Sequence, residues 1–157
     1  CEMRGEAYRG NLERTNIAIV DAALVGMSLS LAAESLGLGT VMIGAMRNDP
    51  VEAAHLLGLP DGAFVVYGLC IGWPAERPPQ KPRLPEDLIV HYEQYNTDKK
   101  QTLALLEEHD KALAEHYRSI GRETPDAAWT GTAARMASNL RREFLRDVLE
   151  KLGLDLT

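Results

Sequence analysis

The segment Ile17–Leu36 constrains the fold more than any other, because it is apolar on nearly every side of a helix. Its length and its Ala, Leu and Met content favour helix over strand, and Gly37 is a natural C-terminal stop. A helix that is apolar all round is buried in a core or an interface, or it crosses a membrane. Glu34 near its end and two serines weaken the case for a span. We therefore expect a packed helix and no membrane partner.

Two strand-like runs follow this helix. Thr40–Ile43 reads as a short buried strand, and Asp49-Pro50 then supplies an N-cap and a first-turn proline for a helix. After the turn at residues 58–62, Ala63–Ile71 reads as a second strand, apolar on both faces and therefore central. A proline-rich irregular connector covers residues 73–85. Two strands joined through a short helix predict a parallel or mixed arrangement, with only part of the sheet in this chain.

The last third of the chain is helical in pattern. Apolar residues recur at helical spacing between Lys99 and Arg118, and again from Met136 to Leu152. Ala127–Thr132 reads as a loop between these two helices. Four arginines lie in or just before the second helix: Arg135, Arg141, Arg142 and Arg146. A solvated helix face explains this basic run better than nucleic-acid binding does. We expect a core portion at residues 1–95 and a helical arm at 96–157, within a single domain 1–157.

Composition limits the class of protein and its partners. A chain of 157 residues can bury a real core, and its net charge of −6 argues against a nucleic-acid partner, which needs a basic face. Cys1 and Cys70 are the only cysteines, so a disulfide framework is not expected and a cytoplasmic location fits. The four histidines lack metal-ligand spacing, and no nucleophile–base arrangement can be assembled. We therefore expect no metal and assign no catalytic side chain.

Two features could together hold an anionic, flat ligand. Gly44 ends the first strand and leaves bare backbone where a ring could approach, with the amide of Ala45 next to it. Lys81 and Arg83 stand two apart on a segment stiffened by prolines, where both could reach one phosphate. Taken alone, each has a plainer explanation, since the glycine can simply turn the chain and the cations can keep the loop soluble.

In its motifs and their order, the chain resembles the nitroreductase-like FMN flavoproteins, in particular the branch of NADPH-dependent flavin and nitro-compound reductases. The resemblance is dense from about Val20 to Tyr95. The residues that carry it are Ala32-Ala33-Glu34-Ser35-Leu36-Gly37-Leu38-Gly39, Ile43-Gly44 with Arg47-Asn48, Leu56-Leu57-Gly58-Leu59-Pro60, Gly68 to Ala75 and Lys81-Pro82-Arg83-Leu84-Pro85. It implies an α+β fold with a mixed sheet flanked by helices, built as an intertwined homodimer with a C-terminal helical arm.

The resemblance also implies cofactors and site residues. FMN would be contacted by Gly44, Ala45, Lys81 and Arg83. In the family a second glycine usually stands where this chain has Ala45, which would be strained if its φ were positive. Arg47 could approach FMN or NADPH, or it could cap the following structure or pair with Glu52. For the electron donor NADPH, the family places arginines in the loop after the first tail helix; the best-matched position holds Ile120, flanked by Arg118 and Arg122.

The implied activity is hydride transfer from NADPH to FMN and then, in ping-pong order, to a small-molecule acceptor such as a nitroaromatic, a quinone or a flavin. The family's N-terminal segment with its phosphate motif is not present, so we expect this chain to be the C-terminal portion of a longer one. The alternative is a non-enzymatic module, in which the helices form a dimerisation or scaffold unit without a bound cofactor.

Overall fold

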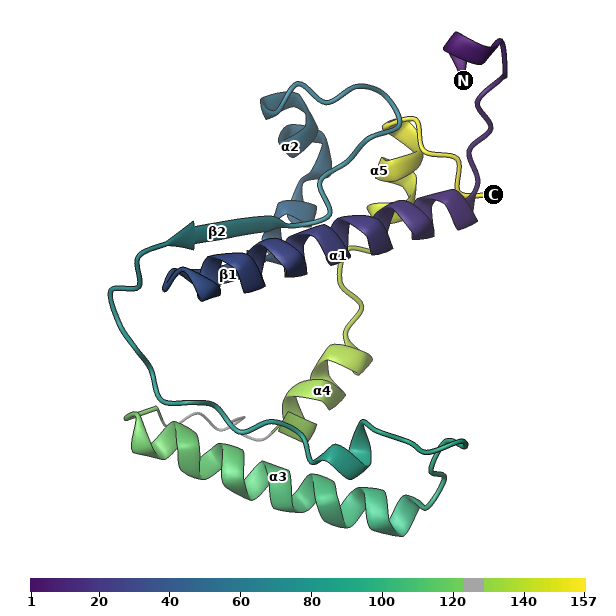
Figure 1. The fold of residues 1–157 in the computed structure, drawn as a ribbon. Coiled ribbons are helices and arrows are strands. Elements are labelled where there is room, and N and C mark those ends of the chain that lie inside the picture. Colours follow the sequence, from purple (N-terminus) through teal and green to yellow (C-terminus); the bar gives the residue numbers. More distant parts are fainter. Residues whose placement is uncertain (123–128) are drawn as a thin grey trace. The chain divides into compact units, whose positions relative to one another are not determined.

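The computed structural model describes residues 1–122 and 129–157, which fall into two compact units (Figure 1). Unit 1 comprises Cys1–Arg77 and Arg142–Thr157, and unit 2 comprises Pro78–Arg141. The elements of unit 1 are the 3-10 helices η1 (Glu2–Arg4) and η2 (Gly44–Asn48), the helices α1 (Leu12–Ser35), α2 (Pro50–Leu56) and α5 (Leu145–Lys151), and the strands β1 (Gly39–Ile43) and β2 (Gly68–Gly72). Those of unit 2 are η3 (Glu86–Leu88), α3 (Lys99–Ser119) and α4 (Trp129–Ser138).

Helix α1 confirms the predicted apolar helix, although it begins five residues earlier, at Leu12 rather than Ile17. Asn11 is its N-cap, and the side chain of Asn11 accepts a hydrogen bond of 2.9 Å from the N–H of Arg14. The helix ends where Gly37 adopts a φ of 80°, a left-handed conformation that glycine takes without a Cβ clash.

A narrow stripe of small residues on α1 packs against the two strands. The buried residues of the stripe are Gly26, Ser30 and Ala33. The ring of Tyr67 lies across Gly26, and its hydroxyl donates a 2.6 Å hydrogen bond to the carbonyl of Ala22. The hydroxyl of Ser30 shares a 2.5 Å hydrogen bond with that of Thr40 on β1. Small side chains therefore let the sheet approach α1 closely.

The rest of α1 is accessible, in contrast to the burial that its composition predicts. Leu24, Val25 and Leu31 are 61%, 60% and 56% exposed. In the described part of the chain, α1 is also the one helix long and apolar enough to cross a membrane by length and composition, although a core helix or a signal sequence passes the same test. Its contacts with Tyr67 and Thr40 are those of a helix packed on protein.

The two strands pair antiparallel, so the parallel pairing considered from the sequence is wrong for these strands. The register runs from Gly39 opposite Gly72 to Ile43 opposite Gly68. The physical reason is the connection between them. The chain leaves β1 through η2 and the seven-residue helix α2, and then returns in irregular backbone to enter β2 from the end where β1 stopped. Helix α2 contacts η2 and α5 and does not cross over the sheet.

The second strand is shorter than predicted. It covers Gly68–Gly72, whereas the apolar run suggested Ala63–Ile71. Strand β1 has only five residues, so it supplies ladder partners for five residues of β2 and no more. The side chain of Ile71 is 46% exposed, which does not fit the central position expected for this strand within the described sheet.

Helix α2 and the C-terminal residues complete unit 1. As predicted, Asp49 caps α2, with its carboxylate accepting from the N–H of Glu52 at 3.0 Å, and Pro50 occupies the first turn. The N–H of Gly62 donates to the carbonyl of Leu152 at 2.7 Å, which ties the turn after α2 to the end of α5.

The C-terminal helices differ from the prediction in two places. The loop expected at 127–132 lies partly outside the described residues, and its part from Trp129 is the first turn of α4. The single helix expected over 136–152 is wrong, because α4 ends at Ser138 and α5 begins at Leu145. Between them Arg142 has a φ of 57°, a left-handed conformation that a right-handed helix excludes.

Candidate functional site

Gly44 and Ala45 lie in unit 1, at the point where β1 ends and η2 begins. The strain considered for Ala45 does not arise: among the described non-glycine residues, only Glu93 and Arg142 have positive φ. Gly44 also has no positive φ, so its role is one of space. A Cβ at Gly44 would lie 3.3 Å from a terminal guanidinium nitrogen of Arg47, which is tighter than ordinary contact. The turn thus presents bare backbone next to a cation.

Arg47, predicted to approach FMN or NADPH, is held inside unit 1. Its Nη1 donates to the carbonyl of Val66, on the segment leading into β2, while its Nη2 faces Gly44. This contact joins the turn after β1 to the backbone before β2. The guanidinium keeps its positive charge at the turn, so Arg47 gives the Gly44–Asn48 segment an electropositive side.

Sequence reasoning missed Arg142, which converges on the same turn from a position 94 residues later in the chain. Its Nε and Nη2 donate to the side-chain oxygen of Asn48 at 2.9 and 2.7 Å, and Nη2 also donates to the carbonyl of Gly44 at 3.3 Å. We expected Arg142 on a solvated helix face. That expectation failed because residues 139–144 are not helical. The spacing of apolar residues continues through the break, so no local signal marked it.

Lys81 lies in unit 2, in the irregular proline-rich connector that the sequence predicts. Its ammonium donates a 2.8 Å hydrogen bond to the hydroxyl of Tyr117 near the end of α3. The ammonium is 5.1 Å from the centre of that ring, so the hydroxyl is its nearer partner. An ammonium has three N–H donors, and one is engaged here. Two donors of Lys81 therefore suit an anionic ligand.

The other predicted cations also belong to unit 2. Arg83 is exposed, two residues beyond Lys81. Arg118 donates from Nε to the carbonyl of Ala114 at 3.4 Å, within α3, and its side chain is exposed. Arg122 follows the helix end, where its N–H donates to the carbonyl of Tyr117 at 2.9 Å. Residues 123–126 of the predicted NADPH segment lie outside the described residues.

The predicted residues therefore form one group in each unit, and the groups share a chemistry. Unit 1 offers the Gly44 and Ala45 backbone with Arg47 and Arg142 beside it. Unit 2 offers Lys81 and Arg83 in the connector, and Arg118 and Arg122 at the end of α3, where Tyr117 accepts the hydrogen bond from Lys81. Backbone N–H groups, ammonium and guanidinium are all donors. Each group, taken by itself, therefore offers donors to an electron-rich or anionic ligand.

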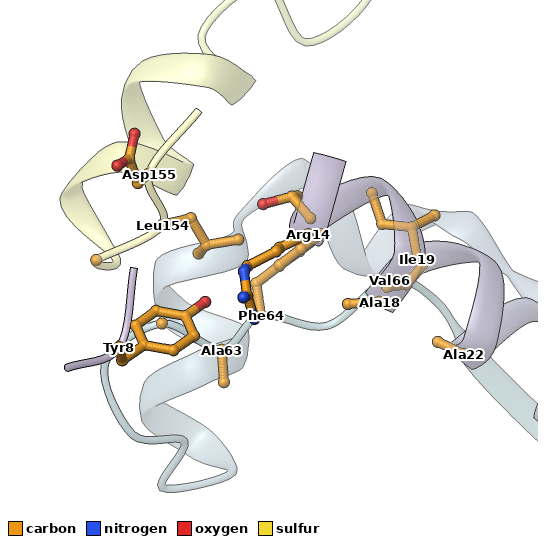
Figure 2. A pocket seen from close by; sticks show the side chains of 13 residues that line it. Tyr8, Arg14, Ala18, Ile19, Ala22, Ala63, Phe64, Val66, Leu154 and Asp155 are labelled. Carbon is orange, nitrogen blue, oxygen red and sulfur yellow. The ribbon is translucent and has the colours of Figure 1, made fainter. Parts of the chain in front are cut away.

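Unit 1 also contains a cavity of about 260 Å³ that none of these residues lines. Figure 2 shows it between the start of α1, the segment after α2 and the C-terminal residues. The guanidinium of Arg14 lies 5.9 Å from the centre of the Tyr8 ring at its rim. Asp155 lines it too, and hydrogen bonds from the hydroxyl and N–H of Thr157 lower the pKa of this carboxyl. The rim thus has charges of both signs over an apolar floor, which includes Phe64 and Leu154.

No group of three or more histidine, cysteine or acidic side chains is placed to hold a metal ion in the parts of the chain that the structure describes. The thiols of Cys1 and Cys70 are both free and exposed.

Two family profiles match consecutive parts of the chain. Residues 6–73 match the nitroreductase family, and residues 81–157 match the C-terminal domain of that family. The chain belongs to the nitroreductase family. The first match contains the Gly44–Asn48 turn, and the second begins at Lys81, so both groups of candidate residues lie in family sequence.

A curated relative supports this membership. The oxygen-insensitive NADPH nitroreductase of Salmonella typhimurium is 40% identical over 149 residues, which are 94% of this chain and 60% of that protein. The chain thus spans about three fifths of the length of the curated relatives it matches.

Solved structures of the family have the same fold as this chain. NfrA1 of B. megaterium superposes with a TM-score of 0.90 at 34% identity, covering 98% of this chain and 64% of that one. The NADPH:FMN oxidoreductase of Vibrio harveyi, solved in complex with NAD+, superposes with a TM-score of 0.84 at 30% identity, covering 98% and 61%. The α+β, nitroreductase-like fold is therefore confirmed.

Proposed function

We propose that this chain is part of an FMN-dependent oxidoreductase that passes hydride from NADPH to a nitroaromatic, a quinone or a flavin in ping-pong order. The observation that carries the proposal is 40% identity, over nearly the whole chain, to a protein named as an NADPH nitroreductase. The cations in the two groups, among them Lys81 and Arg142, support it because they suit an anionic cofactor.

The chain's own residues would bind and orient the cofactor. The Gly44–Ala45 backbone would face the ring, because only a residue without a Cβ leaves that approach open beside Arg47. Lys81 and Arg83 would hold the phosphate through N–H donors, and Arg118 and Arg122 would bind the phosphates of NADPH. When bound, FMN would supply the hydride chemistry, and the protein's part would be to bind and orient it.

Assembly and location are part of the proposal. We place the protein in the cytoplasm as a homodimer, in which the exposed apolar side chains of α1 are covered by the second subunit. Exposed apolar side chains such as Leu24 and Leu31 recur along α1 from Leu12 to Leu31, and apolar surface of this kind marks protein interfaces.

The test is to add FMN to the purified full-length protein of which this chain is a part, and to measure binding by the quenching of flavin fluorescence. We expect binding with a dissociation constant in the micromolar range or tighter, and oxidation of NADPH that depends on an added acceptor such as nitrofurazone. Double-reciprocal plots at several acceptor concentrations should be parallel. A full-length protein that binds no FMN at any concentration tested would contradict the proposal.

Replacing Lys81 and Arg83 together by alanine should weaken FMN binding by about tenfold to a hundredfold, the effect of losing one or two charge-assisted hydrogen bonds. Riboflavin lacks the phosphate, so its binding should change little in the same variant. Equal losses for both flavins would show that the two cations do not contact the phosphate.

The alternative function, a non-enzymatic dimerisation module, is favoured by one observation, the accessible apolar surface of α1. It predicts a stable dimer that neither binds FMN nor oxidises NADPH. Measuring the mass of the protein in solution together with its flavin content separates the two functions.

A further inference from the structure

Arg142 combines two features that rarely occur together by chance. Its backbone is left-handed, with a φ of 57°, which costs free energy in a residue with a side chain. Its guanidinium makes three hydrogen bonds to the Gly44–Asn48 turn. Strained conformations persist where the surrounding contacts hold them, and they cluster at functional sites. The contacts that hold Arg142 are those it makes with the candidate flavin turn.

The chemical consequence lies in the peptide unit that joins Gly44 to Ala45. Its carbonyl oxygen, that of Gly44, accepts from Nη2 of Arg142, and its N–H belongs to Ala45. A cation that donates to one end of a peptide draws electron density toward itself and makes the N–H at the other end a stronger donor, because hydrogen bonds in a chain polarise one another. The Ala45 amide is one of the groups proposed to face the ring.

The electrostatic surroundings reinforce this effect. Asn48 accepts from two nitrogens of Arg142 and fixes the direction of the guanidinium. Arg47 places a second cation beside Gly44, with Nη2 facing it. Asp49, the next residue, keeps a negative charge while it caps α2. The groups that lie nearest to Gly44 itself are the two guanidiniums, and positive charge at this peptide stabilises a ligand there most in its most electron-rich form.

We propose that Arg142 is a positioning residue that polarises the Gly44–Ala45 peptide and thereby favours the reduced over the oxidised form of the flavin bound there. The inference rests on the proposed function, since it concerns the same ligand. Arg142 belongs to the C-terminal part of unit 1, whereas the peptide that it polarises belongs to the turn after β1. The C-terminal segment would therefore help to set the redox potential of the bound flavin.

The test is a reductive titration of the FMN-loaded full chain against a reference dye. Arg142→Met keeps an unbranched, flexible side chain but removes its charge and donors. We expect it to lower the affinity for reduced FMN about tenfold more than that for oxidised FMN. For a two-electron couple, that ratio equals a midpoint potential about 30 mV more negative.

Two variants make the result specific. Arg142→Lys keeps the charge. Its ratio of affinities for reduced and oxidised FMN should stay within twofold of the wild-type ratio, and this variant serves as a test even if Arg142→Met folds poorly. Arg146→Ala removes a neighbouring cation that pairs with Glu150 at 3.1 Å on the exposed face of α5, and it should leave the potential unchanged. A second readout needs no flavin: hydrogen exchange of the 44–48 amides should quicken in Arg142→Met and stay unchanged in Arg146→Ala.

The outcomes are distinguishable. If the wild-type chain binds no FMN, the proposed function fails and this inference fails with it. If wild-type binds FMN and Arg142→Met weakens both redox forms equally, Arg142 is only a structural tie and the inference alone is overturned. An equal shift of potential in Arg142→Met and Arg142→Lys would overturn it too, because charge would not be the cause.

Discussion

Asp110 carries a negative charge where α3 meets α4 within unit 2. Its carboxylate accepts a 3.0 Å hydrogen bond from the N–H of Thr130 and another from the hydroxyl of the same residue. Partial burial acts to raise the pKa of Asp110, but the hydrogen bonds from Thr130 and Trp129 and the charge of His109 outweigh it and lower the pKa below the ordinary value. The carboxylate thereby satisfies donors in the first turn of α4 from a neighbouring helix.

A lowered pKa means that the folded protein favours the charged carboxylate. The stabilisation is therefore fully present above the ordinary pKa of an aspartate, near 3.8, and is lost as the pH falls through the lower folded value. We expect Asp110→Asn to reduce the free energy of unfolding by about 1 kcal/mol at pH 7. The difference from wild type should shrink below pH 4.

Urea unfolding followed by circular dichroism at pH 7 and pH 3.5 measures both values. Glu108→Gln, on the exposed face of the same helix, is the control and should change stability little at either pH. A deficit in Asp110→Asn that is as large at pH 3.5 as at pH 7 would show that the charge of Asp110 does not matter.

At the scale of elements, the contact between α1 and the sheet depends on one glycine. A Cβ built at Gly26 would lie 1.7 Å from the hydroxyl oxygen of Tyr67 and 2.6 Å from the ring carbon that bears it. That hydroxyl is itself fixed by its hydrogen bond to Ala22. With a larger residue at position 26, the Tyr67 ring would have to move and its hydrogen bond to Ala22 would break. The contact between Gly26 and Tyr67 therefore sets the distance between α1 and the strands.

Gly26→Ala should therefore destabilise the protein by about 2 kcal/mol, as overpacking does, despite the better helix propensity of alanine. Gly131 in α4 is a matched control, because a Cβ there meets no atom within 4 Å. Gly131→Ala should stabilise the protein by up to about 1 kcal/mol. Thermal unfolding of both variants checks the pair, and opposite signs are the expected result. If Gly26→Ala were as stable as wild type, the close packing on Tyr67 would be wrong.

For the whole molecule, the accessible apolar side chains of α1 predict association. Leu24 is 61% exposed in the middle of the helix, where a charged residue would oppose burial in an interface. We expect the wild-type chain to be a dimer by analytical ultracentrifugation and Leu24→Glu to be a monomer at concentrations where wild type is not. Met3 is 98% exposed in the N-terminal stretch, so Met3→Glu should leave the mass unchanged. A monomeric wild type at all concentrations would contradict this prediction.

Much of the local structure follows from the sequence, because its causes lie within a few residues. The apolar run and Gly37 define α1 and its end, Asp49-Pro50 defines the start of α2, and the helix from Lys99 is capped by the residue before it. Gly44 and Lys81 could be selected as ligand-binding candidates for the same reason, since bare backbone and a cation between prolines are local properties. The family motifs are also local, and they placed the chain in its family.

The tertiary structure alone decided the rest, because those contacts join residues far apart in the chain. The break between Ser138 and Leu145 leaves the apolar spacing intact, yet it places Arg142 on a turn 94 residues away, where its hydrogen bonds compensate for a strained backbone. The antiparallel pairing of β1 with β2 depends likewise on where the chain returns to the sheet. The exposure of α1 depends on which other segments cover the helix. A sequence pattern reflects interactions between residues close together in the chain. The hydrogen-bond partner of Arg142 depends instead on the path of the whole backbone.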